Sequence, residues 1–306
     1  MITNTGLAAV LAVGLFVSPL AAADNGGDDS AVSLALVGDV MLDETPGKQI
    51  EAGHDPFSPF ASILKAADIR VGNLECVVAT GGNSDPEKIY TFRAHPRTLD
   101  VLKRHFDAVT LANNHSGDFG PLAFGEMLSL LDRQGIAYFG GGVDLARAHA
   151  PLIIERKGLR IAFLGYNEFA PRSFEADYDR PGIAWSEDEQ VRLDLAKARS
   201  RHRADLVIPV MHWGWEFERK GNPRQRQLAR LLIEAGADVV IGGHPHVTQD
   251  AQLAQGDDRD LRIGEAVEGR QHPVDELVRS LRWHRRCAHG ITTSRRDAPG
   301  RGSASR

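Results

Sequence analysis

Short apolar runs rich in β-branched residues recur along the chain and alternate with segments whose apolar positions are spaced by three and four. The first pattern is typical of buried strands, and the second is typical of helices that bury one face. The strand-like runs cover residues 33–37, 69–71, 108–111, 152–154, 160–164, 205–211 and 238–241. This alternation predicts an α/β layered fold with a largely parallel central sheet.

Local signals mark the start of individual helices between these runs. Ser186 and Glu189 have the spacing of a capping box, so we expect a helix to begin at Ser186. Asn222 followed by Pro223 is expected to cap another helix, because proline suits the first helical position. Apolar residues spaced by three and four predict a further helix: Leu99, Leu102 and Phe106.

Five of the strand-like runs end at a turn that is followed by side chains able to bind a metal. In a parallel sheet the residues that follow each strand collect along one edge, where ligands bind. We therefore expect one site at this edge. Its candidate members are Asp39, Glu75, Asn113, Asn114, His115, His212, Glu216, His244 and His246.

The most informative of these segments is the one that ends in His244, Pro245 and His246. A strand that runs into glycines and then presents two imidazoles two residues apart aims both rings the same way, as a pair of metal ligands requires. Two divalent metals held roughly 3.5 to 4 Å apart can clamp a phosphoryl group and acidify a bound water. The residue types suit Mn, Fe or Zn.

Within such a site the roles can be divided by chemistry. A dinuclear centre needs a bridging carboxylate, further oxygen ligands and imidazoles. His115 would then be free to protonate a leaving group or stabilise developing charge. The expected metal ligands are Asp39, Glu75, Asn114, His212, His244 and His246.

Each of these residues also has a structural interpretation. Asp39 could cap the following helix, and Glu75 could brace a turn. His212 could be a hydrogen-bonded histidine near a core, and Trp213 and Trp215 beside it are expected to pack rather than to stack on a ligand. The functional interpretation gains weight because these alternatives would have to hold independently at every position.

Composition and charge narrow the class of protein. With 306 residues, of which 42% are hydrophobic and 25% charged, the chain can bury a substantial core. The formal net charge of -5 gives no basic footprint for nucleic acid, so we expect no nucleic-acid partner.

The first residues are expected to be a targeting segment. Residues 7–20 form an apolar run too short to span a bilayer comfortably, and small residues follow it at positions 21–23. We interpret residues 1–23 as a signal peptide and residues 24–31 as a linker, which predicts an exported, periplasmic or envelope-associated protein. An uncleaved N-terminal anchor is the alternative.

The segments around the candidate site resemble the CapA family, also called PgsA-like, of capsule or poly-γ-glutamate synthesis proteins. This family is similar in fold to the calcineurin-like metallophosphoesterases, and the resemblance covers about residues 32 to 250. It implies an α/β/β/α domain, which we place at residues 32–256. The matching residues lie at Gly38-Asp39-Val40-Met41, Gly72-Asn73-Leu74-Glu75, Leu111-Ala112-Asn113-Asn114-His115 with Asp118 and Gly120, His212-Trp213-Gly214 with Glu216, and Gly243-His244-Pro245-His246-Val247.

The resemblance also implies roles for these positions. Asp39 resembles the first metal carboxylate, and Glu75 stands where the superfamily has a bridging aspartate. Asn114 and His115 resemble the Asn-His of a Gly-Asn-His motif, and His212, His244 and His246 resemble its later histidine ligands. Supporting positions are Asn73, Asn113, Asp118 and Glu216.

Two departures from the superfamily keep two classes of function open. Met41 stands where a histidine usually follows the first aspartate, and Glu75 replaces an aspartate at the bridge. One hypothesis is a metal-dependent hydrolase acting on a phosphoester or an amide. The other is an accessory protein that uses the same pocket to hold an anionic polymer, such as poly-γ-glutamate, beside membrane-bound synthesis or export proteins.

The last 50 residues break the pattern. Residues 257–306 contain eleven arginines, no lysine and no phenylalanine, and their strand-like periodicity disappears. We interpret this Arg-rich tail as a frameshifted or degenerated end, which would make the chain an inactive family member. The alternative is a surface helix around residues 274–286 followed by a disordered terminus.

Overall fold

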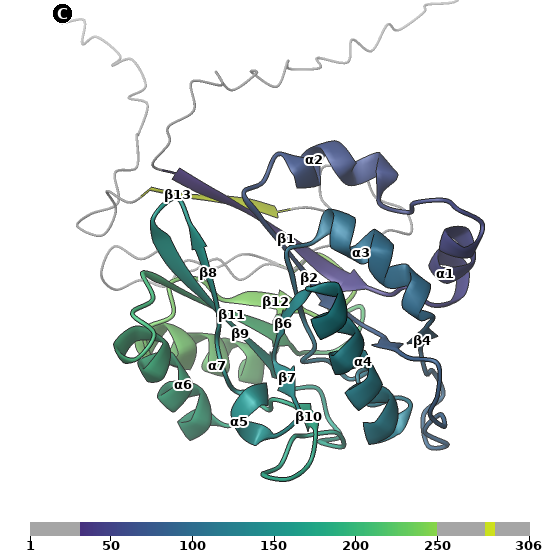
Figure 1. Cartoon of the computed structure of the whole chain (residues 1–306). Helices are drawn as coiled ribbons and strands as arrows, with labels where there is room; N and C mark the ends of the chain where they lie inside the picture. Colours follow the sequence, from purple (N-terminus) through teal and green to yellow (C-terminus); the bar gives the residue numbers. More distant parts are fainter. Residues whose placement is uncertain (1–30, 250–278, 285–306) are drawn as a thin grey trace, which may run out of the picture.

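The computed structural model describes residues 31–249 and 279–284, and four of the five strands of its first sheet come from the amino-terminal half of the chain (Figure 1). The strand order is β13-β1-β2-β5-β6. All neighbouring strands are parallel except β13, which pairs antiparallel with β1. The strands are β1 (Ala31–Val40), β2 (Ile69–Leu74), β5 (Ala108–Thr110), β6 (Ala137–Phe139) and β13 (Arg279–His284).

The second sheet has the order β12-β11-β9-β8. Strands β12, β11 and β9 are parallel, and β8 is antiparallel to β9. The strands are β8 (Leu152–Arg156), β9 (Leu159–Asn167), β11 (Leu206–His212) and β12 (Ile241–Gly243).

Three apolar clusters show how the layers stack. One lies between the sheets, where Leu34 and Val71 of the first sheet share a core with Phe163 and Ile208 of the second. The other two lie outside the sheets, beneath pairs of helices. Helices α3 (Leu99–His105) and α4 (Gly120–Gln134) cover the first sheet, and α6 (Asp188–Ser200) and α7 (Pro223–Glu234) cover the second. The α/β/β/α architecture is therefore confirmed.

Shorter elements connect these layers. The helices are α1 (Glu44–Glu51), α2 (Ala61–Lys65) and α5 (Leu145–Ala148), with 3-10 turns at Ser58–Phe60 and Pro96–Thr98. Two small two-stranded sheets pair β3 (Val77–Val78) with β4 (Arg93–Ala94), and β7 (Gly141–Gly142) with β10 (Gly182–Ile183). No helix within residues 31–249 and 279–284 is long and apolar enough to cross a membrane.

Most of the expected strands are present, but the last one starts later than expected. Strand β12 begins at Ile241 rather than at residue 238. The carboxylate of Asp238 accepts a hydrogen bond from the Val207 backbone N–H at 2.7 Å and pairs with Arg199. Val239 and Val240 are buried as core side chains without joining the ladder. Their hydrophobicity therefore reflects burial rather than strand pairing.

The helix signals gave mixed results. The helix expected from Leu99, Leu102 and Phe106 is confirmed, and so is the cap expected at Asn222, whose side chain accepts from the Gln225 backbone N–H. The expected cap at Ser186 is wrong, because α6 begins at Asp188 with Glu187 before it. The Ser186 hydroxyl donates instead to the Glu168 carboxylate and to the Asn167 carbonyl.

The terminal predictions lie mostly outside the described residues. The signal peptide and residues 24–30 of the linker are outside them, and residue 31 already belongs to β1. The surface helix expected around residues 274–286 is wrong for residues 279–284, which form strand β13. That strand pairs with β1 through backbone positions 31–36. The rest of the Arg-rich tail beyond residue 256 is outside the described residues.

Candidate metal centre

The candidate residues meet where strands of both sheets end. Asp39 lies near the end of β1, and His212 is the last residue of β11. Glu75 directly follows β2, and its backbone N–H donates to the Val40 carbonyl at 3.1 Å. His244 directly follows β12. Segments more than a hundred residues apart in sequence thus supply side chains to one place.

On the side of the first sheet, the polar side chains are linked by hydrogen bonds. The Asn73 side-chain amide donates to Asp39 Oδ1 at 2.7 Å. The Asn113 amide donates to Asn73 Oδ1 and to the Leu74 carbonyl, both at 2.9 Å. Asn113 Oδ1 accepts from the His115 backbone N–H at 3.0 Å. Asn73 and Asn113 therefore orient Asp39 and the turn that carries His115.

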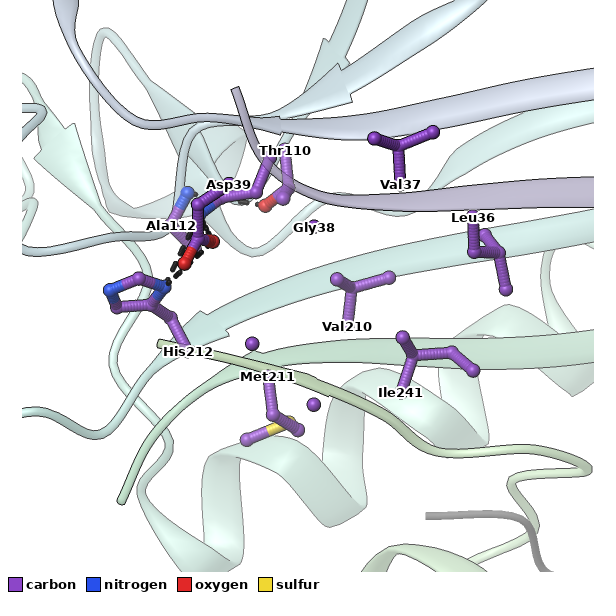
Figure 2. Close-up of a pocket in the computed structure, with 13 residues that line it drawn as sticks. Leu36, Val37, Gly38, Asp39, Thr110, Ala112, Val210, Met211, His212 and Ile241 are labelled. Atoms are coloured by element: carbon purple, nitrogen blue, oxygen red, sulfur yellow. Dashed lines mark hydrogen bonds and ion pairs between the residues drawn. The ribbon is translucent and has the colours of Figure 1, made fainter. Parts of the chain in front are cut away.

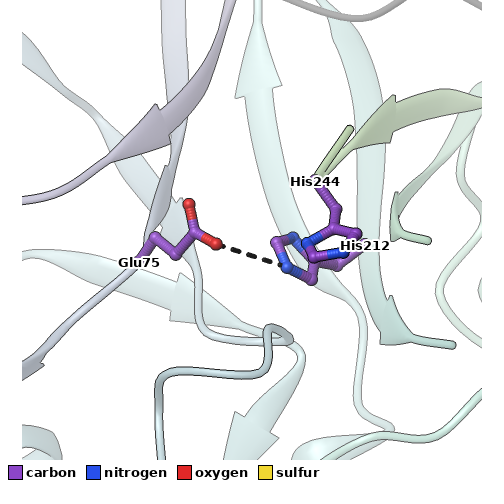
Figure 3. Close-up of side chains that lie close together, drawn as sticks. All are labelled: Glu75, His212 and His244. Atoms are coloured by element: carbon purple, nitrogen blue, oxygen red, sulfur yellow. Dashed lines mark ion pairs between the residues drawn. The ribbon is translucent and has the colours of Figure 1, made fainter. Parts of the chain in front are cut away.

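His212 lies between the two sheets and faces donors and acceptors from several strands. Its Nε2 is 2.7 Å from Asn114 Oδ1. The same nitrogen is 3.4 Å from Glu75 Oε1 (Figure 3). Its Nδ1 is 3.2 Å from the Asn73 side-chain nitrogen and 3.9 Å from Asp39 Oδ1. Burial, together with the neighbouring His244, lowers the pKa of His212 well below its ordinary value. The neutral imidazole is the form that binds metals.

His244 and His246 lie in a turn with unusual backbone geometry. Their φ angles are 98° and 54°, values that residues other than glycine rarely adopt. His246 Nδ1 is 3.2 Å from Asp39 Oδ2, and the His244 ring centroid is 4.7 Å from that of His212. Such strain persists only where surrounding structure enforces it, and it concentrates at functional sites.

The His244 ring provides the clearest test of whether a metal fits. The residue is fully buried, and neither ring nitrogen has a hydrogen-bond partner among the described residues. Leaving buried polar atoms unpaired costs about 1 to 3 kcal/mol each. Burial also lowers the pKa of His244 to about 4, so the ring is neutral near pH 7. A neutral, unpaired imidazole suits a metal ion as partner.

Three overlapping groups of donor atoms surround this ring. Within each group, one ligand atom from each side chain lies within 4.8 Å of the others. Glu75 belongs to two of the groups, and His244 and His246 also belong to two each. The groups are Glu75, His212 and His244; Asp39, Glu75 and His246; and Glu216, His244 and His246. These carboxylates and imidazoles are donor types that suit a divalent cation.

Asp39 is suited to bind a cation because it is held ionised. Burial opposes its charge, but the hydrogen bond with His246 and the neighbouring His212 outweigh that effect and lower the pKa of Asp39 below its ordinary value. Behind Asp39 and His212 a cavity extends between the sheets (Figure 2). Its lining beyond those two residues is mainly apolar and includes Val37, Val210 and Ile241.

His115 lies beside the metal-binding groups and has its own carboxylate partner. Its Nδ1 is 2.8 Å from Asp118 Oδ2, and Asp118 is fully buried. Lys88 donates to Asp118 Oδ1 at 2.6 Å and to the Asn114 carbonyl. The sequence analysis missed Lys88, because it lies in a segment without strand or helix periodicity. The Asp118 carboxylate orients the His115 ring, and Lys88 balances its charge.

The structure also decides between some of the alternative interpretations. Asp39 does not cap the following helix, since Asp43 is the N-cap of α1. Trp213 is buried and packs, as expected. The expectation that Trp215 packs is wrong, because its exposed fraction is 59%. Its ring lies beside Phe169, whose own ring centroid is 4.0 Å from that of His244. Trp215 therefore lies close to the candidate centre on an open loop.

Comparison with known proteins places the chain in a protein family. Residues 33–259, which carry every candidate side chain, match the family model for the bacterial capsule synthesis protein PGA_cap. The chain belongs to this family. The family expected from the sequence motifs is therefore confirmed.

Relatives from three bacteria share this region. The PGA biosynthesis protein CapA of Bacillus subtilis is 30% identical over 233 residues, covering 74% of this chain and 61% of that protein. The capsule biosynthesis protein CapA of Bacillus anthracis is 27% identical, covering 72% and 56%. A probable polyglutamine synthesis accessory protein of Mycobacterium tuberculosis is 28% identical, covering 66% and 56%. The chain thus spans less than two thirds of the length of these relatives.

Proposed function

We propose that this protein acts in the synthesis or export of an anionic capsule polymer of the poly-γ-glutamate type, and that it does so as a metal-dependent hydrolase. The observation that carries the catalytic part is the fully buried His244, whose ring nitrogens lack hydrogen-bond partners among the described residues, within overlapping donor groups. The names of the relatives support the process.

The metal ligands in this proposal come from both sheets. Two divalent ions would polarise the bond to be cleaved and lower the pKa of the attacking water. The donor chemistry suits Mn, Fe or Zn. The residues that would hold the ions are Asp39, Glu75, Asn114, His212, His244 and His246.

His115 performs the proton transfer in this proposal. Its Nδ1 faces Asp118, which leaves Nε2 as the nitrogen that gives a proton to the leaving group. The buried Asp118 carboxylate fixes the orientation of the ring. An amide nitrogen must gain a proton to leave as a neutral amine, and an ester oxygen must gain one to leave as an alcohol, so the same residue serves for amide and phosphoester substrates.

A second candidate is a non-enzymatic accessory role, in which the pocket holds the polymer without cleaving it. One observation favours it: the M. tuberculosis relative carries the name accessory protein. In that case the metal ions would bind carboxylates of the polymer, and His115 would have no proton to transfer.

The two candidates are separated by a His115→Ala variant of the full chain. Metal-loaded parent and variant are incubated with poly-γ-glutamate and with bis(p-nitrophenyl) phosphate, and chain length and nitrophenol release are followed. Loss of a general acid lowers kcat for cleavage of poly-γ-glutamate by about 100-fold or more, and that for bis(p-nitrophenyl) phosphate by less because nitrophenolate leaves without a proton, while the metal content stays that of the parent. Parent protein that binds metal and polymer without cleaving either substrate would instead support the accessory role.

We also propose that the protein is exported, on the basis of the apolar segment and small residues before position 24. Mass spectrometry of protein recovered from the envelope of an expressing bacterium tests this. A mature N-terminus near residue 24 is expected. An intact Met1 on protein that stays in the cytoplasm would contradict export.

An inactive family member is the remaining alternative, motivated by the composition of residues 257–306. The coding DNA for that region decides: an intact alternative reading frame encoding alternating apolar residues would support a frameshift. Its absence would favour a genuine terminus.

A further inference from the structure

Glu216 lies on the loop after β11, and its carboxylate is close to two histidines of the candidate centre. One Glu216 oxygen and one ring nitrogen each of His244 and His246 lie within 4.8 Å of one another. Glu216 is exposed, whereas His244 is fully buried with both ring nitrogens lacking hydrogen-bond partners among the described residues. The loop thus places a carboxylate on the open side of the buried imidazole.

The backbone attaches this loop directly to the histidine turn. The Trp213 N–H donates to the Gly243 carbonyl at 3.1 Å, and the Phe217 N–H donates to the Pro245 carbonyl at 2.7 Å. These two hydrogen bonds flank Glu216 in the sequence. The position of its carboxylate relative to His244 and His246 is therefore set by the backbone.

Buried amide side chains support the same loop from behind. Gln249 donates to the Glu218 carbonyl at 2.7 Å, and Gln225 donates to Gln249 at 3.1 Å. Gly214 has a φ of +91°, and a Cβ there would lie 2.8 Å from the Gln225 side chain. The positive φ favours glycine at the position where the chain turns from β11 into this loop.

The donor group that contains Asp39 has fewer metal-ligand atoms than a transition-metal ion usually binds. Asp39, Glu75 and His246 form a group of three, whereas divalent transition metals usually take four or more ligands. Met41, two residues after Asp39, offers no imidazole, and its sulfur accepts a hydrogen bond from the Asp43 N–H at 3.2 Å. A carboxylate near His246 would complete the group.

We propose that Glu216 is itself a metal ligand and supplies an oxygen to the ion held by His246. This assignment rests on the metal centre of the proposed function. A carboxylate from an exposed loop gives that ion a ligand on the side open to solvent, where substrate enters.

Cobalt loading of the full chain tests the assignment without measuring turnover. The variants are Glu216→His, Glu216→Gln and, as matched control on the same loop, Glu218→His. Glu216→His should bind as much cobalt as the parent but with a shifted visible absorption spectrum, because a nitrogen ligand replaces an oxygen ligand. Glu216→Gln should bind one cobalt equivalent at least about 10-fold more weakly. Glu218→His should match the parent in both measurements.

An unchanged cobalt spectrum in Glu216→His overturns the assignment, whatever the affinity of Glu216→Gln. An equal spectral shift in Glu218→His overturns it too. If the parent protein binds no cobalt, that result contradicts both the proposed metal centre and the assignment of Glu216 as its ligand. If the parent binds cobalt but does not hydrolyse substrate, only the proposed hydrolase activity is contradicted. The spectra of the variants then still show whether Glu216 is a metal ligand.

Discussion

The first sheet supplies the candidate centre with side chains that are already hydrogen-bonded to one another, whereas the turn after β12 of the second sheet supplies His244, whose ring makes no hydrogen bond among the described residues. Asn113, Asn73 and Asp39 form a chain of hydrogen bonds from the first sheet. On the second sheet, His244 has a positive φ and no hydrogen-bond partner for its ring among the described residues. The first side is organised without a ligand, while the His244 ring on the second side leaves both of its nitrogens for one.

This difference suggests that stability and ligand binding are separated between the sheets. Changes on the first sheet should lower the stability of the metal-free protein. Changes on the second should abolish metal binding while leaving the metal-free fold largely intact. The predictions below test this separation, starting with the largest effect.

Replacing both His244 and His246 by alanine should abolish the metal centre, because each of the three donor groups contains at least one of these two residues. Metal content measured by elemental analysis should fall from about two equivalents per chain to near zero. Any metal-dependent hydrolysis should fall by more than about 1,000-fold. Retention of both metals by a folded double variant would show that the centre lies elsewhere.

Acid should destabilise the metal-free protein through the second sheet. Burial lowers the pKa of His244 to about 4, below its ordinary value of 6.5. Between these two pH values the unfolded chain binds more protons, so the free energy of unfolding falls as the pH is lowered through this window, by up to about 3 kcal/mol. The pKa of His212 is also lowered, so its protonation adds to this effect. The lowered pKa of Asp39 affects the free energy of unfolding only below about pH 3.8, its ordinary pKa.

Urea unfolding at several pH values measures this effect. Asparagine tolerates a positive φ, so His244→Asn should keep the backbone of the turn. In this variant the free energy of unfolding should change less between pH 6.5 and 4 than it does in the parent. Equal slopes in parent and variant would mean that His244 is not held neutral by burial.

On the first sheet, Asn113→Ala should lower the unfolding free energy of the metal-free protein by about 2 kcal/mol at neutral pH. The side chain is fully buried and makes hydrogen bonds to Asn73, Leu74, His115 and Ser116. His244→Asn is the matched comparison and should cost less than about 1 kcal/mol. A larger loss in His244→Asn than in Asn113→Ala would reverse the proposed separation.

Lys88→Met should lower the free energy of unfolding by about 1 kcal/mol, because solvent can partly replace a side chain that is 24% exposed. It should also weaken metal binding a few-fold by loosening the turn that carries Asn114 and Asp118. Calorimetric metal titration and urea unfolding measure both effects. Lys103→Met, which loses one bond to the Gln134 carbonyl, is the control and should leave metal affinity unchanged.

Much of the fold could be predicted because its strands are local apolar runs that end in turns. Strands β1, β2, β5, β8, β9 and β11 all overlap predicted runs. The predictions were wrong where the same sequence pattern can result from two different structural roles. Val239 and Val240 are apolar because they are buried in the core, and Ser186 is polar because it bonds Glu168 rather than capping α6.

The sequence by itself determined which side chains follow the strands, because strand ends and turns depend on neighbouring residues and parallel strands share an edge. It therefore predicted that Asp39, Glu75, His212 and His244 would meet. Only the tertiary structure decided that Glu75 lies within two donor groups, that Lys88 reaches Asp118, and that Glu216 lies against the histidine turn. These contacts join distant segments, and they depend on how the two sheets pack face to face.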